Sequence, residues 1–390
     1  MNAEVFNTIK NEYSTPAFVF DEDELLSRAG SIRQILGGIS FCYSIKANPF
    51  LIPAADVAVD YFEVCSPGEL AICKALKVSP EKIIYSGVHK EADDIEDALS
   101  YGAAVLTAES LRHYHLICDA SARLKKHAKV LLRLTSKNQF GMSLEDIETI
   151  LEKSDENVTV IGLHYFAGTG RKQAKKQIEE LGMLTDIVCR FKEKYGDSFH
   201  MLEYGPGLPY PYFEDDDFSD TLMPLKNISE ALSSVSLKCS LSVEMGRFLA
   251  SSCGYYLTSI CDLKKSSDNN WCITDGGINH VNYLGQMMGM KVPVISHLRD
   301  GAEVTGGMKE NYSVCGSLCT TNDMLIRSFA MNDPKIGDLL VFSNIGAYSV
   351  TEAPALFLSR TLPCILACRN GNIRLLRKSV ESWKINIQDS

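Results

Sequence analysis

Eight short runs of β-forming residues alternate with helical segments between residues 40 and 246. In one of these segments, Glu91–Tyr101, the apolar residues recur at helical spacing and fall on one face. A strand followed by a helix, repeated eight times, predicts an α/β fold of the (β/α)8 TIM-barrel type. The predicted strands are Ser40–Ile45, Tyr61–Cys65, Lys82–Gly87, Ala103–Ala108, Lys129–Leu134, Val158–Phe166, His200–Gly205 and Ser240–Gly246.

The alternative for such a pattern is a doubly wound open sheet. That fold normally has a glycine-rich nucleotide-binding turn after its first strand, where this chain reads YSIKANPF. From about Gly254 the pattern changes to β runs with few helices, and Asn370-Gly371 between apolar runs predicts a hairpin turn. We therefore expect a barrel over residues 24–255, and a second, all-β domain built from residues 1–23 and 256–390.

Composition limits the functions that remain. The chain has 390 residues and a formal charge of -10, which argues against nucleic acid and anionic membranes, since both attract basic clusters. No signal peptide is recognisable, and no stretch approaches the roughly 18 apolar residues of a membrane span. Thirteen cysteines occur without a CxxC pair or a Cys/His cluster. This predicts reduced thiols, no metal site and a cytoplasmic location.

The unusual polar residues fall where the predicted strands end, which is where barrel enzymes place their chemistry. Each has an ordinary alternative, because a lysine at a strand end can be solvated and a lone histidine can belong to the core. A Gly-Pro-Gly run can be only a turn, and a Glu/Arg pair can be structural. Their coincidence on one rim is what indicates a site. The main candidates are Lys46, Arg133, His164, Gly168–Gly170, Gly205–Gly207, Glu244 and Arg247.

This set of groups suits a phosphorylated aldehyde cofactor. A lysine amine can form a Schiff base with an aldehyde. Glycines let backbone N–H groups approach a phosphate, and a guanidinium adds charge-assisted hydrogen bonds. A carboxylate can keep a pyridine nitrogen protonated, which makes the ring an electron sink.

At these residues the sequence resembles the fold type III pyridoxal-phosphate decarboxylases, the family of diaminopimelate and ornithine decarboxylases. The likeness extends from Pro16 to about Ser379, and the order of its motifs makes it specific. The matching stretches are YSIKAN, EVCSPGEL, YSGVHK, SKNQFGM, the His164 strand, EYGPG, EMGR, TDGG, GSLCTTND and GAY.

The resemblance implies a role for each matching residue. Lys46 would carry pyridoxal 5'-phosphate, His164 would stack on its ring, and Glu244 would pair with its pyridine nitrogen. Cys319 would be the acid that protonates the carbanion after carbon dioxide leaves, and its loop would reach the site from the partner subunit of a homodimer. The remaining cofactor contacts would come from Glu69, Arg133, Thr169, Gly205, Gly207, Gly246, Arg247 and Tyr348.

One position departs from the family pattern. The residue after the cysteine is usually acidic and binds the distal ammonium of the substrate, but here it is Thr320. A neutral hydroxyl cannot pair with a buried ammonium. Asp323 keeps the family spacing from Cys319, which favours Cys319 over Cys315 as the acid. We expect Thr320, Asp323, Arg247 and Tyr348 to contact the substrate.

The predicted activity is removal of the α-carboxylate from an amino acid or an amino-acid conjugate, which could be tethered to a carrier protein. Three alternatives stay open at this point. They are a diaminopimelate decarboxylase of lysine biosynthesis, a pyridoxal-phosphate racemase and a non-catalytic binder that regulates a partner.

Overall fold

The computed structural model describes residues 1–153 and 155–388. The chain forms two compact units. The barrel unit contains residues 27–210 and 220–249, and the sheet unit contains residues 1–26, 211–219 and the chain from Ala250 onward. Within the described residues, no helix combines the length and apolarity that a transmembrane span requires.

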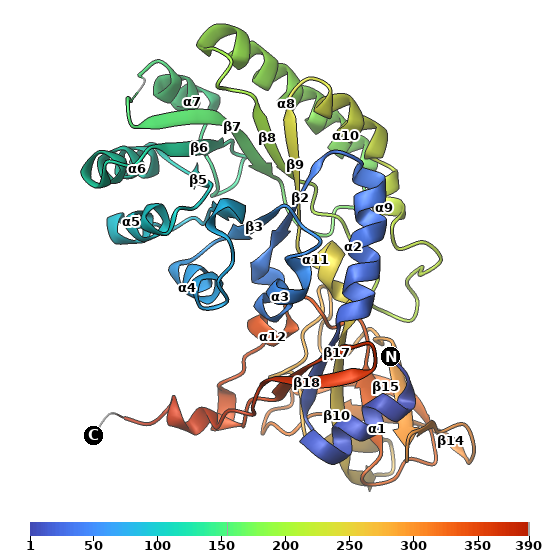
Figure 1. Cartoon of the computed structure of the whole chain (residues 1–390). Helices are drawn as coiled ribbons and strands as arrows, with labels where there is room; N and C mark the ends of the chain where they lie inside the picture. The colour runs from blue at the N-terminus through green and yellow to red at the C-terminus, as the bar shows by residue number, and fades with distance from the viewer. Residues whose placement is uncertain (154, 389–390) are drawn as a thin grey trace. The chain divides into compact units, whose positions relative to one another are not determined.

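Eight parallel strands close into the predicted barrel, each paired with the next along the chain and the last with the first (Figure 1). The prediction of a (β/α)8 barrel is confirmed. The strands are β2 (Ser40–Ser44), β3 (Tyr61–Val64), β4 (Ile83–Tyr85), β5 (Val105–Ala108), β6 (Ala128–Arg133), β7 (Val158–Phe166), β8 (Met201–Gly205) and β9 (Ser240–Met245).

Helices follow the strands, and their boundaries have local causes. Ser66, Ser110 and Ser143 each accept a hydrogen bond from a backbone N–H of the first helical turn. The apolar face expected in the segment after β4 is buried. The helices are α2 (Glu22–Leu36), α3 (Ile52–Ala55), α4 (Pro67–Ala75), α5 (Ala92–Tyr101), α6 (Leu111–Leu124), α7 (Leu144–Leu151), α8 (Ala174–Tyr195), α9 (Met223–Lys226), α10 (Ser229–Ser236) and α11 (Arg247–Ala250).

The sheet unit is built on a ten-stranded sheet, so the expected all-β domain is present. The first strand of the chain, β1, lies between β10 and β17, antiparallel to the former and parallel to the latter. The strands are β1 (Ala17–Asp21), β10 (Gly254–Lys265), β11 (Asn270–Thr274), β12 (Ile295–Arg299), β13 (Ala302–Glu303), β14 (Lys309–Cys315), β15 (Met324–Asn332), β16 (Leu339–Phe342), β17 (Cys364–Arg369) and β18 (Asn372–Arg377).

The sheet unit contains elements that the sequence pattern did not reveal. Helix α1 (Ala3–Tyr13) packs Phe6 and Ile9 into an apolar cluster with residues of the sheet. Strand β15 continues directly from the loop that carries Cys319. The predicted hairpin is confirmed between β17 and β18, where Asn370 and Gly371 have φ angles of 50° and 76°.

Candidate active site

Lys46 lies at the carboxyl end of the barrel, in a single 3-10 turn over Ile45–Ala47 directly after β2. Its Nζ is 2.6 Å from Glu63 Oε2 on β3 and 3.5 Å from Glu244 Oε1 on β9. The lysine side chain is 36% exposed, whereas those of Glu63 and Glu244 are 3% and 5% exposed. Strand pairing therefore brings one partly accessible amine between two buried carboxylates.

Glu244 is held by three neighbours. In addition to Lys46, Ser44 Oγ donates a hydrogen bond to Oε1 at 2.6 Å, and His164 Nε2 lies 3.3 Å from Oε2. Burial alone would raise the pKa of Glu244, but the charge of Lys46 and the hydrogen bond from His164 outweigh it and hold this pKa well below its usual range. These contacts therefore favour the ionised form of Glu244 in the barrel interior.

His164 and Phe166 occupy successive inward-facing positions of β7, because side chains two residues apart on a strand share a face. His164 is 1% exposed and is paired in register with Arg133 and Glu203. Phe166 is half-buried at the strand's carboxyl end, where it is paired with Gly205. The histidine thus lies one layer deeper than the phenylalanine.

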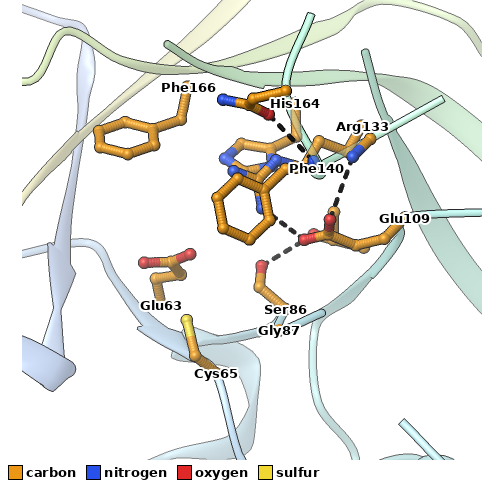
Figure 2. A network of polar contacts seen from close by, with 12 residues as sticks. Glu63, Cys65, Ser86, Gly87, Glu109, Arg133, Phe140, His164 and Phe166 are labelled. Carbon is orange, nitrogen blue, oxygen red and sulfur yellow. Dashed lines mark hydrogen bonds and ion pairs between the residues drawn. The ribbon is translucent and has the colours of Figure 1, made fainter. Parts of the chain in front are cut away.

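Arg133 forms a buried ion pair with Glu109, which follows β5 (Figure 2). The Arg133 guanidinium also lies 4.8 Å from the centre of the Phe140 ring. Glu109 Oε2 accepts a hydrogen bond from Gly141 N at 3.3 Å. The loop after β6 is thereby fastened to the carboxyl end of the barrel by one carboxylate.

A glycine turn joins the loops after β7 and β8. Gly207 has a φ of 61°, and a Cβ on it would collide with Gly168 O, so only glycine fits. The two loops are also bonded through Arg171 N, which donates to Gly207 O at 2.9 Å. Arg247, at the start of α11 and directly after Gly246, donates from Nε to Thr169 Oγ1 at 3.4 Å. The result is a backbone cradle with a guanidinium beside it.

These residues fit a bound pyridoxal phosphate. The set provides an amine, a carboxylate that stays ionised, and a glycine cradle with an arginine. The Nδ1 atom of the buried His164 also lacks a hydrogen-bond partner among the described residues. Glu69, by contrast, caps the helix in which it lies. Its Oε2 accepts a hydrogen bond from Cys65 N at 2.6 Å, and its backbone N–H donates one to Ser66 Oγ.

Four predicted site residues lie in the sheet unit. Cys319 is exposed, whereas Cys315 is half-buried and its pKa is raised by burial. Thr320 Oγ1 accepts a hydrogen bond from Asn322 N at 3.3 Å. Asp323 is 3% exposed. Tyr348 has a φ of 70° and precedes the short helix α12 (Ser349–Glu352).

Three buried carboxyl groups of the barrel escaped the sequence prediction, namely Glu63, Glu109 and Glu203. Glu203 is fully buried, and its pKa is raised well above the usual value by burial and by the charge of Glu244. Its oxygens have no hydrogen-bond partner among the described nitrogen and oxygen atoms. Glu63 and Glu203 could have been recognised from the sequence, because each is a glutamate at an inward-facing position of an otherwise apolar strand.

Ligand atoms of Glu63, His164 and Glu244 lie within 4.8 Å of one another, an arrangement that could also hold a metal ion. Lys46 already contacts both of these carboxylates, however. The ammonium supplies the positive charge that a cation would bring, so we assign the cluster to the lysine.

The fold and the site together define a barrel enzyme whose polar centre is a lysine between carboxylates at the carboxyl ends of the strands. A family profile described as "Pyridoxal-dependent decarboxylase, pyridoxal binding domain" matches residues 22–251, and the chain belongs to this family. The protein is a pyridoxal phosphate-dependent amino-acid decarboxylase, as predicted.

Curated relatives agree with this family. The L-glutamyl-[BtrI acyl-carrier protein] decarboxylase of Niallia circulans is 26% identical, with 95% of this chain and 92% of the relative aligned. The diaminopimelate decarboxylase of Methanocaldococcus jannaschii is 27% identical over 81% of this chain and 75% of its own length.

Solved structures show the same fold. A crystal structure of the M. jannaschii diaminopimelate decarboxylase superposes with a TM-score of 0.85 at 22% identity, covering 98% of this chain and 94% of that one. A lysine/ornithine decarboxylase from Vibrio vulnificus, complexed with cadaverine, gives a TM-score of 0.82 at 20% identity, covering 94% and 96%. The family and the named relatives are decarboxylases, which favours decarboxylation over the racemase and non-catalytic alternatives.

Proposed function

We propose that this enzyme decarboxylates an amino acid whose side chain ends in a neutral, conjugated group, with the barrel holding the cofactor and Cys319 returning a proton. Pyridoxal phosphate, when bound, supplies an aldehyde that condenses with amines and a ring that accepts electrons from the bond to the departing carboxylate. The protein's residues have the task of binding, orienting and moving protons.

Lys46 would hold the cofactor covalently, and Glu63 is placed to take the proton that its ammonium must lose. The 2.6 Å separation of Lys46 Nζ and Glu63 Oε2 supports this assignment. Glu244 would face the pyridine nitrogen as a fixed anion, which favours a proton on that nitrogen. The Gly168–Gly207 cradle and Arg247 would hold the phosphate.

In this proposal Phe166 packs against the cofactor ring, the role that the family resemblance implies for His164. His164 lies one layer deeper in the barrel. Phe166 lies level with Gly205, the first residue of the Gly-Pro-Gly turn, whereas the Nε2 edge of His164 is directed to Glu244. An aromatic face at the mouth suits a flat cofactor ring. A buried imidazole in contact with Glu244 instead suits orientation of that carboxylate.

The substrate assignment rests on the loop that carries Cys319, and Thr320 is the observation that supports it. Its hydroxyl accepts a hydrogen bond within its own turn, and a hydroxyl offers no charge to a distal ammonium. Residues 316–323 contain one carboxylate, Asp323, and both of its oxygens accept backbone N–H groups. A substrate with a neutral far end avoids an uncompensated ammonium in this loop.

The relative from N. circulans, whose name specifies an acyl-carrier-protein-bound glutamyl substrate, supports a carrier-tethered amino acid as the conjugate. Such a substrate would be linked through its side-chain carboxyl, because the α-carboxylate must remain free to leave. The competing substrate is diaminopimelate, which many of the aligned relatives decarboxylate according to their names.

A carbon dioxide release assay separates these possibilities. We expect release from glutamate joined through its side-chain carboxyl to a carrier protein or to N-acetylcysteamine. We expect at least about tenfold lower kcat/KM for meso-diaminopimelate, which corresponds to about 1.4 kcal/mol of discrimination. A preference for diaminopimelate would overturn the substrate assignment, and no release from either substrate would count against a substrate of this class.

A further inference from the structure

Asp323 is the single carboxylate of the loop that carries Cys319, residues 316–323. Its Oδ1 accepts a hydrogen bond from Ile278 N at 2.9 Å, and its Oδ2 accepts one from Leu318 N at 2.7 Å. The side chain therefore joins the residue before Cys319 to a turn some forty residues earlier in the chain.

The packing around this carboxylate is close on both sides. A Cβ on Gly277 or on Gly316 would collide with the carboxylate oxygens of Asp323, and one on Gly316 would also collide with Gly277. Two glycine turns thus meet with one carboxylate between them. No larger residue fits at either glycine without moving Asp323.

The same residue also closes the loop through its backbone. Gly316 N donates to Asp323 O at 3.1 Å, and Asp323 N donates to Thr320 O at 3.1 Å. The residues that flank this loop, Cys315 at the end of β14 and Met324 at the start of β15, are paired with each other in the sheet. Cys319 is thereby presented at the exposed tip of an eight-residue loop whose base is fixed.

A second fastening lies on the outer side of the loop. Arg360 donates from its guanidinium to Ser317 O at 2.6 Å. Asp323 itself is 3% exposed, whereas Cys319 is exposed. The carboxylate thus faces into the protein and the thiol faces outward.

We propose that Asp323 is a positioning residue for Cys319, not a ligand of the substrate. It sets the place and direction of the thiol by tying Leu318 to Ile278. This inference rests on the proposed function, because it concerns the acid of that reaction. It replaces the direct substrate contact that the sequence alone suggested for Asp323.

The substitution Asp323→Asn tests the proposal, because an amide keeps the shape but can accept only one of the two N–H groups. We expect kcat for the glutamyl thioester to fall about 10- to 100-fold, with KM changed less than about twofold. Cofactor absorbance should not change, since the hydrogen bonds of Asp323 join it to Ile278, Leu318, Gly316 and Thr320 and to none of the proposed cofactor contacts. The matched control is Asp268→Asn, at an exposed aspartate of the sheet unit, which should leave both parameters unchanged.

A double-mutant cycle with Cys319→Ala shows whether Asp323 acts through the thiol. We expect Asp323→Asn to have almost no further effect on kcat in the Cys319→Ala background, because the residue it positions is gone. Full additivity of the two losses would overturn the proposal, since it would indicate an independent structural or substrate-binding role.

Hydrogen exchange of the holoenzyme, compared between the wild type and Asp323→Asn, provides a readout that needs no substrate. The amides of Ile278 and Leu318 should exchange slowly, and Asp323→Asn should accelerate both without changing the barrel peptides. Rapid exchange of both amides in the wild type would contradict the anchoring. If no substrate releases carbon dioxide, the proposed function fails, while this measurement still decides whether Asp323 fastens the loop.

Discussion

Three carboxyl groups, Glu63, Glu203 and Glu244, are buried in the interior of the barrel. A buried carboxylate is costly when no cation or hydrogen-bond donor compensates its charge. The ammonium of Lys46 contacts Glu63 and Glu244, whereas burial and the charge of Glu244 raise the pKa of Glu203. Burial and the neighbouring anion thus favour the protonated form of Glu203 in the folded protein.

The pH dependence of stability tests this state of Glu203. Above about pH 4.3 an unfolded glutamate loses a proton that the folded Glu203 retains, so this residue lowers stability as pH rises, by up to about 1.4 kcal/mol per pH unit. Glu203→Gln mimics the neutral acid and removes that penalty. We expect the melting temperature of the variant, relative to the wild type, to increase from pH 5 to pH 8. A constant difference would show that Glu203 is ionised.

At the scale of elements, the barrel was predictable because its strands and helices have distinct periods in the sequence. The residues at strand ends followed from that alternation, which is how Lys46, Arg133 and Glu244 were found. Glu63 was not found, because its neighbour in space, Lys46, follows another strand, and only the register of β2 and β3 brings the two residues together. Strand β15 was not predicted, because it begins at Met324, directly after the motif GSLCTTND that contains Cys319.

The glycine cradle allows a test at this scale with a built-in control. Gly207→Ala should lower stability by about 1–3 kcal/mol and weaken cofactor retention, because the new methyl group would meet Gly168 O at a positive φ. Gly182→Ala, in the middle of α8 with open space around it, should instead stabilise by about 0.5–1 kcal/mol. Urea unfolding and cofactor absorbance of the two variants measure both effects. Equal retention in both would argue against the cradle as a phosphate site.

At the scale of the whole molecule, the proposed acid and the proposed cofactor lysine belong to different units. Exposed apolar side chains also concentrate in parts of the sheet unit, which is typical of surfaces that meet a partner. They include Leu284, Met287, Met288, Met290, Leu356, Phe357, Leu358, Trp383, Ile385 and Ile387. This exposed apolar surface suits the homodimer that the family resemblance implies, in which each active site would take residues from both copies.

Mixing two inactive variants tests that expectation. Lys46→Ala lacks the amine and Cys319→Ala lacks the acid, so neither should be active alone. If each site takes its lysine from one copy and its cysteine from the other, random mixing restores about one quarter of the wild-type activity, since half of the dimers each contain one complete site. Carbon dioxide release after subunit exchange measures this recovery. The absence of any recovery in proven heterodimers would place both residues in the same copy.

The central claim, that Lys46 is the amine that holds the cofactor, is tested most directly by borohydride reduction followed by peptide mapping. The strongest competitor is Lys90, a fully buried lysine whose pKa is lowered to about 8 by burial and which donates to Ser86 O at 3.2 Å. We predict that the reduced phosphopyridoxyl group is found on Lys46 alone and is lost in Lys46→Ala. A label on Lys90, or no label on protein that retains the cofactor, would contradict the account.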